Sequence, residues 1–191
     1  ENEDLFIALG FGFVIAIFLM FSILVIQFNS FSQPFIIVYA IVMSLLGVNI
    51  GLFLTDTPRS LAFIIGVISL SGIVVNDAII MVDRINNLRK KYTEKSLKEI
   101  IAFSGSTRLQ PIILTTLTTA AGIFPLTFVD KFWAGLAITV MFGLVVASTL
   151  TLFVTPAMYY QFTREGFCTA LPGLAIIGVL ILISSAFSLA I

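Results

Sequence analysis

The sequence has no histidine and only one cysteine, Cys168, among its 191 residues. Without histidine the chain cannot form a Ser-His-Asp or Cys-His catalytic site or an HExxH zinc site. A single cysteine cannot form an intrachain disulfide, and it has no second thiolate with which to hold a metal ion. We therefore expect no cofactor and no metal centre.

Charged residues are also scarce. They make up 10% of the chain, whereas hydrophobic residues make up 59%, a balance that does not suit a soluble domain. Several stretches of about 20 residues are almost free of charge, which is the length needed to cross a hydrocarbon core of ~30 Å. The alternating pattern of barrel strands is missing, and lipid tolerates only helices or closed barrels. The composition predicts an all-α, polytopic transmembrane helix bundle.

We predict a single transmembrane domain, residues 1–191, with six spans. Pro34 is placed to open the second span, Pro125 to kink or end the fourth, and Pro156 to end or bend the fifth. The chain begins with acidic residues, the wrong charge for a signal peptide, so we expect a segment of a longer polypeptide. The spans are expected at about 5–26, 35–54, 61–85, 111–128, 132–153 and 171–191.

Residues 86–108 form the longest polar connection in the sequence. Ser96 and Glu99 have the spacing of a capping box. The apolar residues Ile100 and Phe103 follow, so we predict a short amphipathic helix lying at the membrane surface. Because the spans alternate in direction, eight of the ten basic residues fall on the side of this connection. The positive-inside rule then places 86–108 in the cytoplasm and the N-terminus in the periplasm.

Asp77 is the only ionisable residue between Leu61 and Val82. An acid at membrane depth costs about 3 kcal/mol on insertion scales and therefore usually marks a functional position. Asn76 precedes it and shares one helical face with other polar or small residues, namely Ser69, Gly72 and Asp83. This polar edge has to face other helices or a wet cavity rather than lipid.

Two interpretations of Asp77 remain open from the residues alone. An ionised Asp77 would seek Arg108 or a threonine hydroxyl, and protonation would weaken these contacts and let the helices shift. Alternatively, Asp77 stays protonated and hydrogen-bonded to Asn76, Thr115 or Ser69.

The neighbouring polar residues have structural explanations too. A threonine such as Thr115 more often bonds to the backbone of its own helix than to a relay. Arg108, at a helix entrance, would by default be a snorkelling anchor. Asp83 is expected to pair with Arg84 or Arg89.

Three stretches resemble the resistance-nodulation-division (RND) exporters: GIVVNDAIIMVDRINNLR, RLQPIILTTLTTAAGIFPLTF and GLVVASTLTLFVTPAMYYQF. The resemblance covers about residues 5–162 and includes the QFNSFSQPF turn. It implies a proton-driven exporter of the bacterial inner membrane that consists of two similar six-helix halves and large periplasmic domains. It also implies as partners the other half, these absent periplasmic domains, further copies in a homotrimer, a periplasmic adaptor and an outer-membrane channel, with no nucleic acid.

The resemblance also implies a proton relay. By motif position, Asn76 falls where second halves of the drug exporters carry a lysine, while Arg108 and Thr115 match an arginine and a threonine of that relay. Asp77 occupies a position that is acidic in first halves and often an amide in second halves. Without the lysine, the cationic partner has to come from elsewhere. The ending FVTPAMYY favours a second half, but a first half stays open because the sixth span could start the next half.

We therefore expect a membrane half-domain of a proton-coupled RND-type exporter, with a relay of Asp77, Asn76, Arg108 and Thr115. The alternative is a structural or assembly module that packs against partner helices without moving protons. An intramembrane enzyme would need a second acid or a nucleophile at membrane depth, and Asp77 stands alone there. We do not expect an enzyme, and we assign no catalytic residues.

Overall fold

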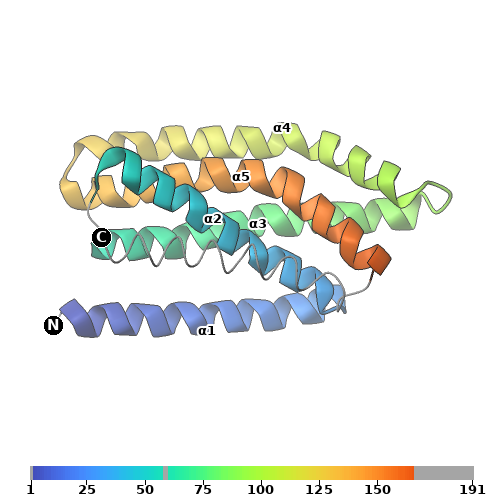
Figure 1. The fold of residues 1–191 in the computed structure, drawn as a ribbon, viewed down its shortest axis with the longest axis horizontal. Helices are drawn as coiled ribbons and strands as arrows, with labels where there is room; N and C mark the ends of the chain where they lie inside the picture. Colours follow the sequence, from blue (N-terminus) through green and yellow to red (C-terminus); the bar gives the residue numbers. More distant parts are fainter. Residues whose placement is uncertain (1, 58–59, 166–191) are drawn as a thin grey trace.

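The computed structural model describes residues 2–57 and 60–165. This part of the chain forms five long helices and no strand, so the predicted all-α bundle is confirmed (Figure 1). The predicted sixth span, 171–191, lies outside the described residues. The helices are α1 (Asn2–Phe28), α2 (Ser32–Thr55), α3 (Leu61–Lys91), α4 (Leu97–Ile123) and α5 (Lys131–Glu165), and the 3₁₀ helix η1 (Phe124–Phe128) joins α4 to α5.

All five helices are long and apolar enough to cross a membrane. α3 has 31 residues and is therefore ~46 Å long at 1.5 Å per residue, which exceeds a hydrocarbon core of ~30 Å. Its last turn carries Arg89, Lys90 and Lys91, so this end projects beyond the apolar layer. The third helix therefore connects the membrane interior to a basic surface.

Proline residues mark the start of α2 and the end of α4. α1 ends at Phe28, Asn29 adopts a left-handed conformation with φ 47°, and Pro34 lies in the first turn of α2, as predicted. α4 ends at Ile123, directly before η1, which has Pro125 near its start. A proline cannot donate the backbone hydrogen bond of a helix interior, which accounts for this end.

α5 does not end at Pro156 but continues to Glu165. The buried residues Met158, Tyr159 and Phe162 follow the proline and pack into the core. Their burial offsets the single backbone hydrogen bond that Pro156 removes.

The connection between α3 and α4 differs from the prediction. α3 continues to Lys91 and α4 begins at Leu97, so the expected amphipathic surface helix in 86–108 is wrong. Ser96 is the N-cap, as predicted, and its hydroxyl accepts a hydrogen bond from the backbone N–H of Glu99 at 3.4 Å.

The first turns of α4 pack on α3 instead of lying on the membrane surface. Ile100 and Ser104 are buried, and the Ser104 hydroxyl approaches the Met81 sulfur at 3.9 Å. Pro111, which we expected to begin the span, lies inside the helix. Contact with α3 thus keeps the segment from 97 to 111 in one helix with the fourth span.

α5 lies at the centre of the bundle and contacts α2, α3 and α4 (Figure 1). Small residues allow this close approach. A Cβ atom on Gly47 of α2 would lie 2.6 Å from Val146 Cβ and 2.7 Å from the Phe142 carbonyl oxygen. A Cβ atom on Gly51 would lie 2.5 Å from Phe142 Cβ. Glycine at these two positions therefore lets α2 and α5 pack closely together.

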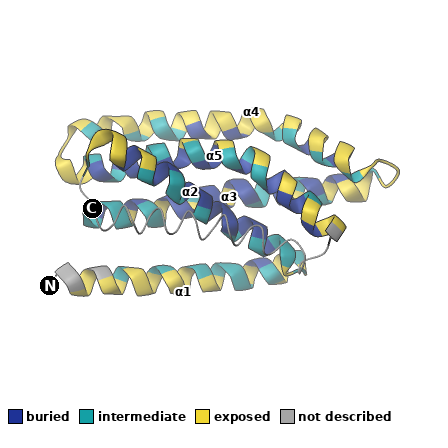
Figure 2. Ribbon diagram, viewed as in Figure 1, coloured by how far each residue is buried: buried dark blue, intermediate teal, exposed yellow. Residues whose placement is uncertain are grey.

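α1 is the least enclosed helix of the described chain. Most of its residues are exposed (Figure 2). Phe18 is 69% exposed and Ile26 is 81% exposed. Gly10 and Gly12 have no neighbouring atom that a Cβ would meet within 4 Å, so no described helix approaches closely there. α1 contacts α2 and α3 and leaves its outer apolar face free for lipid or for other parts of the protein.

We expect Gly47→Ala to destabilise the bundle by about 1–3 kcal/mol, because the new methyl group meets the backbone of α5 and forces α2 away. Gly72→Ala is the matched control, since Gly72 lies on α3 with nothing within 4 Å of its added Cβ. Thermal unfolding in detergent should show a lower Tm for Gly47→Ala only. Equal Tm values for the two variants would contradict the close α2–α5 contact.

Candidate functional site

Asp77 and Asn76 lie on different sides of α3. Asp77 is buried, with 7% of its surface exposed, whereas Asn76 is exposed. Successive residues of a helix point about 100° apart, so one helix can bury the acid and present the amide. Ser69, Gly72, Asn76 and Asp83 are all exposed and share one face of α3, as their spacing predicted, and the contact of this face with other helices or a wet cavity stays a prediction.

α3 is held against α5 on both sides of Asp77. In one direction, Leu70 of α3 contacts the backbone of Gly143 so closely that no Cβ would fit there. In the other direction, the Tyr159 hydroxyl of α5 donates a hydrogen bond to Asn86 Oδ1 at 2.7 Å. In each of these contacts the α3 residue and the α5 residue are the same number of residues apart in the sequence. α3 and α5 therefore run parallel, and Asp77 lies between the two contacts.

The carboxylate of Asp77 has no hydrogen bond or ion pair with a described residue. This finding disagrees with the static alternative, in which Asn76, Thr115 or Ser69 holds the acid. The Thr115 hydroxyl donates to the backbone carbonyl of Ile112 at 2.9 Å, the bond to its own helix that threonine commonly makes.

Arg108 is the cation of α4 at the depth of Asp77. The contact between Met81 and Ser104 fixes the register of the antiparallel helices α3 and α4. Asp77 lies four residues before Met81, and Arg108 lies four residues after Ser104, so the two stand at about the same depth. Arg108 is half-buried, and its Nε finds no hydrogen-bond partner within the described ranges.

A hydroxyl pair that the sequence reasoning missed connects α4 to α5. Thr116 is buried, and its Oγ1 lies 2.8 Å from both Ser148 Oγ and the Ile112 carbonyl oxygen. The neighbouring Thr115 faces outward. Ser148, one of several hydroxyl residues within the apolar sequence of α5, is the signal that could have indicated this contact.

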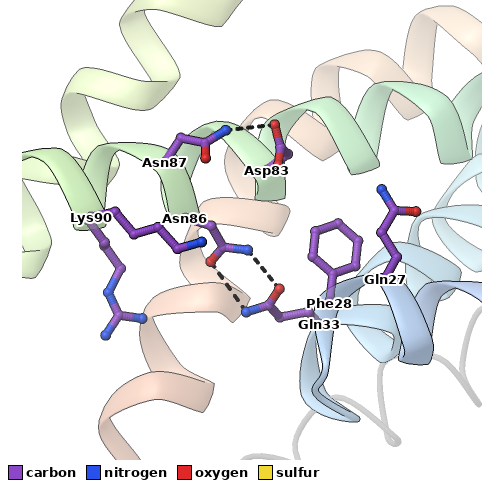
Figure 3. Close-up of a pocket in the computed structure, with 8 residues that line it drawn as sticks. Gln27, Phe28, Gln33, Asp83, Asn86, Asn87 and Lys90 are labelled. Carbon is purple, nitrogen blue, oxygen red and sulfur yellow. Dashed lines mark hydrogen bonds between the residues drawn. The ribbon is translucent and has the colours of Figure 1, made fainter.

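The predicted partner of Asp83 is wrong. Asp83 Oδ2 accepts a hydrogen bond from Asn87 Nδ2 at 2.9 Å, and in the described chain it pairs with neither Arg84 nor Arg89. Asp83 and Asn87 are one turn apart on the exposed face of α3, so the amide reaches the acid without crossing to another helix (Figure 3).

A second polar cluster joins the ends of α2, α3 and α5. Gln33 and Asn86 exchange two amide hydrogen bonds, of 3.3 Å and 2.8 Å (Figure 3). Tyr159 donates to Asn86, and Arg89 Nη1 donates to the Tyr159 oxygen at 2.9 Å. Each side chain of this cluster forms a hydrogen bond with another member. These bonds fix α3 relative to α2 and α5 at the end nearest the loop between α3 and α4. Sequence reasoning gave this cluster no role.

No group of three or more His, Cys, Asp or Glu side chains that could hold a metal ion occurs among the described residues. The polar groups within the described part of the bundle include Asp77, several hydroxyls, and the buried Nε atoms of Arg84 and Arg108. Such groups can exchange or conduct protons.

A model of the AcrB/AcrD/AcrF family matches residues 7–163. The chain belongs to this family. The RND resemblance predicted from the sequence motifs is thereby confirmed, and the five described spans are part of the membrane portion of an RND transporter.

Relatives and solved structures agree with this assignment. The chain is 34% identical over 167 residues to the swarming motility protein SwrC of Bacillus subtilis, which covers 83% of this chain. It is 35% identical over 153 residues to the multidrug resistance protein MdtC of Yersinia pseudotuberculosis, which covers 78% of it. The crystal structure of a heavy metal efflux pump matches with a TM-score of 0.69 and 28% identity over 78% of this chain. The chain spans 15% of the length of each of these three proteins.

We expect Tyr159→Phe to destabilise the bundle by about 1–3 kcal/mol, because the hydrogen bonds of its hydroxyl to Asn86 and Arg89 are both lost. Tyr160→Phe is the control, since the Tyr160 hydroxyl accepts only an exposed bond from Arg164 on the same helix. The measurement is Tm in detergent. Matching Tm values for the two variants would show that the cluster does not hold the helices together.

Proposed function

We propose that the chain is a membrane half-domain of a proton-coupled RND-type exporter in the bacterial inner membrane, with Asp77 as the proton carrier. The observation that carries the proposal is the isolation of this acid. Asp77 is the only acidic residue of its apolar stretch, it is 7% exposed, and no described residue binds its carboxylate. Periplasmic domains outside this chain would handle the exported substrate.

The charge of Asp77 would couple the proton to helix movement. When it is ionised inside the bundle, the carboxylate needs a cation or several hydrogen-bond donors. When it is protonated, this need disappears and the surrounding helices can adopt another packing. Protonation of Asp77 thereby shifts the equilibrium between two arrangements of the same bundle. Coupling requires at least two such arrangements.

Arg108 is the counter-charge that we assign to the ionised state. α2 has no charged residue, and α5 has none between Lys131 and Arg164, so neither helix supplies a competing cation at this depth. The register of α3 and α4 brings Arg108 level with Asp77. Attraction between the two would draw α4 toward α3, and protonation of Asp77 would release it.

Asn76 and Thr115 take supporting roles in this proposal. Asn76 is exposed on this half, so we assign it to the contact with the other half of the transporter. The Thr115 hydroxyl donates to its own helix and keeps its lone pairs free to accept a hydrogen bond from Arg108 or from water. The relay is therefore completed between the two halves and not within this chain alone.

We further propose that the loop between α3 and α4 faces the cytoplasm and that the N-terminus faces the periplasm. Lys98 of α4 lies over the Tyr160 ring of α5 at 5.8 Å, and Arg164 lies over the same ring at 6.0 Å. Lys98 of α4 and Arg164 of α5 thus lie at the same end of the bundle. The complete protein would work as a homotrimer with a periplasmic adaptor and an outer-membrane channel.

In the complete transporter, we expect Asp77→Asn to abolish proton flux and to reduce substrate export to background, because the amide cannot take up and release a proton. The control is Asp83→Asn, which removes an acid from the exposed face of the same helix. Both variants should reach the membrane in normal amounts. Proton flux in proteoliposomes and export from cells are the measurements.

Retained flux and export in Asp77→Asn would contradict the proton role and favour a module that only packs against partner helices. Equal loss of flux in Asp83→Asn would also contradict the proposal, because the effect would then not depend on the buried position.

A further inference from the structure

A pocket of about 470 Å³ lies where the end of α1, the start of α2 and the last turns of α3 meet (Figure 3). We call it the interfacial pocket. It lies at the basic end of α3, beyond the apolar stretch that contains Asp77. Its lining residues are Gln27, Phe28, Gln33, Asp83, Asn86, Asn87, Arg89 and Lys90.

The cationic side chains of the interfacial pocket have hydrogen-bond donors that no described residue accepts. The Lys90 ammonium makes no hydrogen bond or ion pair with any described residue. Arg89 uses one guanidinium N–H for Tyr159, and within the described chain the remaining donors have no hydrogen-bond acceptor. The one carboxylate of the lining, Asp83, accepts a hydrogen bond from Asn87 and keeps its negative charge. An anion entering the pocket would therefore meet two cations with free donors and one carboxylate, a net positive charge.

A second hollow, of about 220 Å³, adjoins the interfacial pocket, and Gln33 and Arg89 line both. It adds the hydroxyl groups of Ser30 and Ser32 to the available hydrogen-bonding groups, whereas the Thr163 hydroxyl, which also lines it, donates to the Tyr159 carbonyl. Cationic and hydroxyl donors together suit the oxygen atoms of a phosphate group.

Exposed apolar surface continues directly from the pocket. Gln27, at its edge, follows Ile26, which is 81% exposed, and Ile23 one turn earlier is 63% exposed. Both belong to α1, whose outer face is free of described neighbours over most of its length (Figure 2). A ligand with a charged head and an apolar tail would find both surfaces in one place.

We propose that the interfacial pocket binds the phosphate of an acidic phospholipid, with Lys90 and Arg89 contacting the headgroup and the acyl chains lying along α1. Basic pockets between helices at the cytoplasmic surface suit such headgroups. Free inorganic phosphate offers the same phosphate oxygens but has no acyl chain that could contact the apolar face of α1. The adjoining Ile23 and Ile26 therefore favour the lipid. This inference does not depend on proton movement through Asp77.

The test measures lipid binding to the purified full-length protein by native mass spectrometry, with phosphatidylglycerol as the acidic probe and phosphatidylcholine as the zwitterionic one. Lys90→Gln should weaken phosphatidylglycerol binding about fivefold, the effect of one basic residue near an anionic headgroup. Lys91→Gln is the matched control, because it removes the same charge one residue away and does not line the pocket. Lys90→Arg should retain binding.

Three results would overturn the proposal. Equal weakening by Lys90→Gln and Lys91→Gln would indicate general attraction to a basic surface. Equal affinity for phosphatidylcholine and phosphatidylglycerol would remove the role of the anionic headgroup. Displacement of phosphatidylglycerol by inorganic phosphate at equal concentration would assign the pocket to the free anion. Lys90 is exposed and has no described partner, so its variants should keep the Tm of the parent protein.

Discussion

A carboxyl group can stay inside a membrane only where protein encloses it, because lipid offers no hydrogen bond and screens no charge. In this chain the enclosed carboxyl belongs to Asp77 of α3, a helix that packs against both α5 and α4. The glycine contacts bring α2 and α5 together at Gly47 and Gly51, and Gly143 lets α3 approach α5. These close approaches replace lipid around the acid with helix surface.

The helices around Asp77 are not held with equal strength. α3 is attached to α5 at Gly143 and again at Tyr159, and Gln33 ties the same end to α2. α4 has few buried residues in comparison, and a hydrogen bond between Thr116 and Ser148 joins it to α5. Since Arg108 lies on α4, the helix that carries the proposed counter-charge is also held by fewer contacts than α2, α3 or α5.

Much of the fold could be predicted because lipid imposes a simple rule on sequence. Apolar runs of about 20 residues indicated the described spans, Pro125 marked a helix end, and an acid in an apolar stretch identified Asp77. The connection 86–108 was predicted wrongly because an apolar face suits a membrane surface and a neighbouring helix equally well, and only tertiary contact of Ile100 with the core decides between them. The partners of Asp83 and Thr116 likewise depend on how helices are rotated about their axes, which one sequence does not specify.

The account depends most on whether Asp77 takes up and releases a proton inside the bundle. Infrared difference spectroscopy of the full-length transporter in membranes tests this directly, because a protonated carboxyl group has a carbonyl stretch that a carboxylate lacks. We predict a carboxyl band that is present at acidic pH, disappears at alkaline pH and is missing from Asp77→Asn. A band assigned to Asp77 that persists unchanged at alkaline pH would show a permanently neutral acid and would contradict the account.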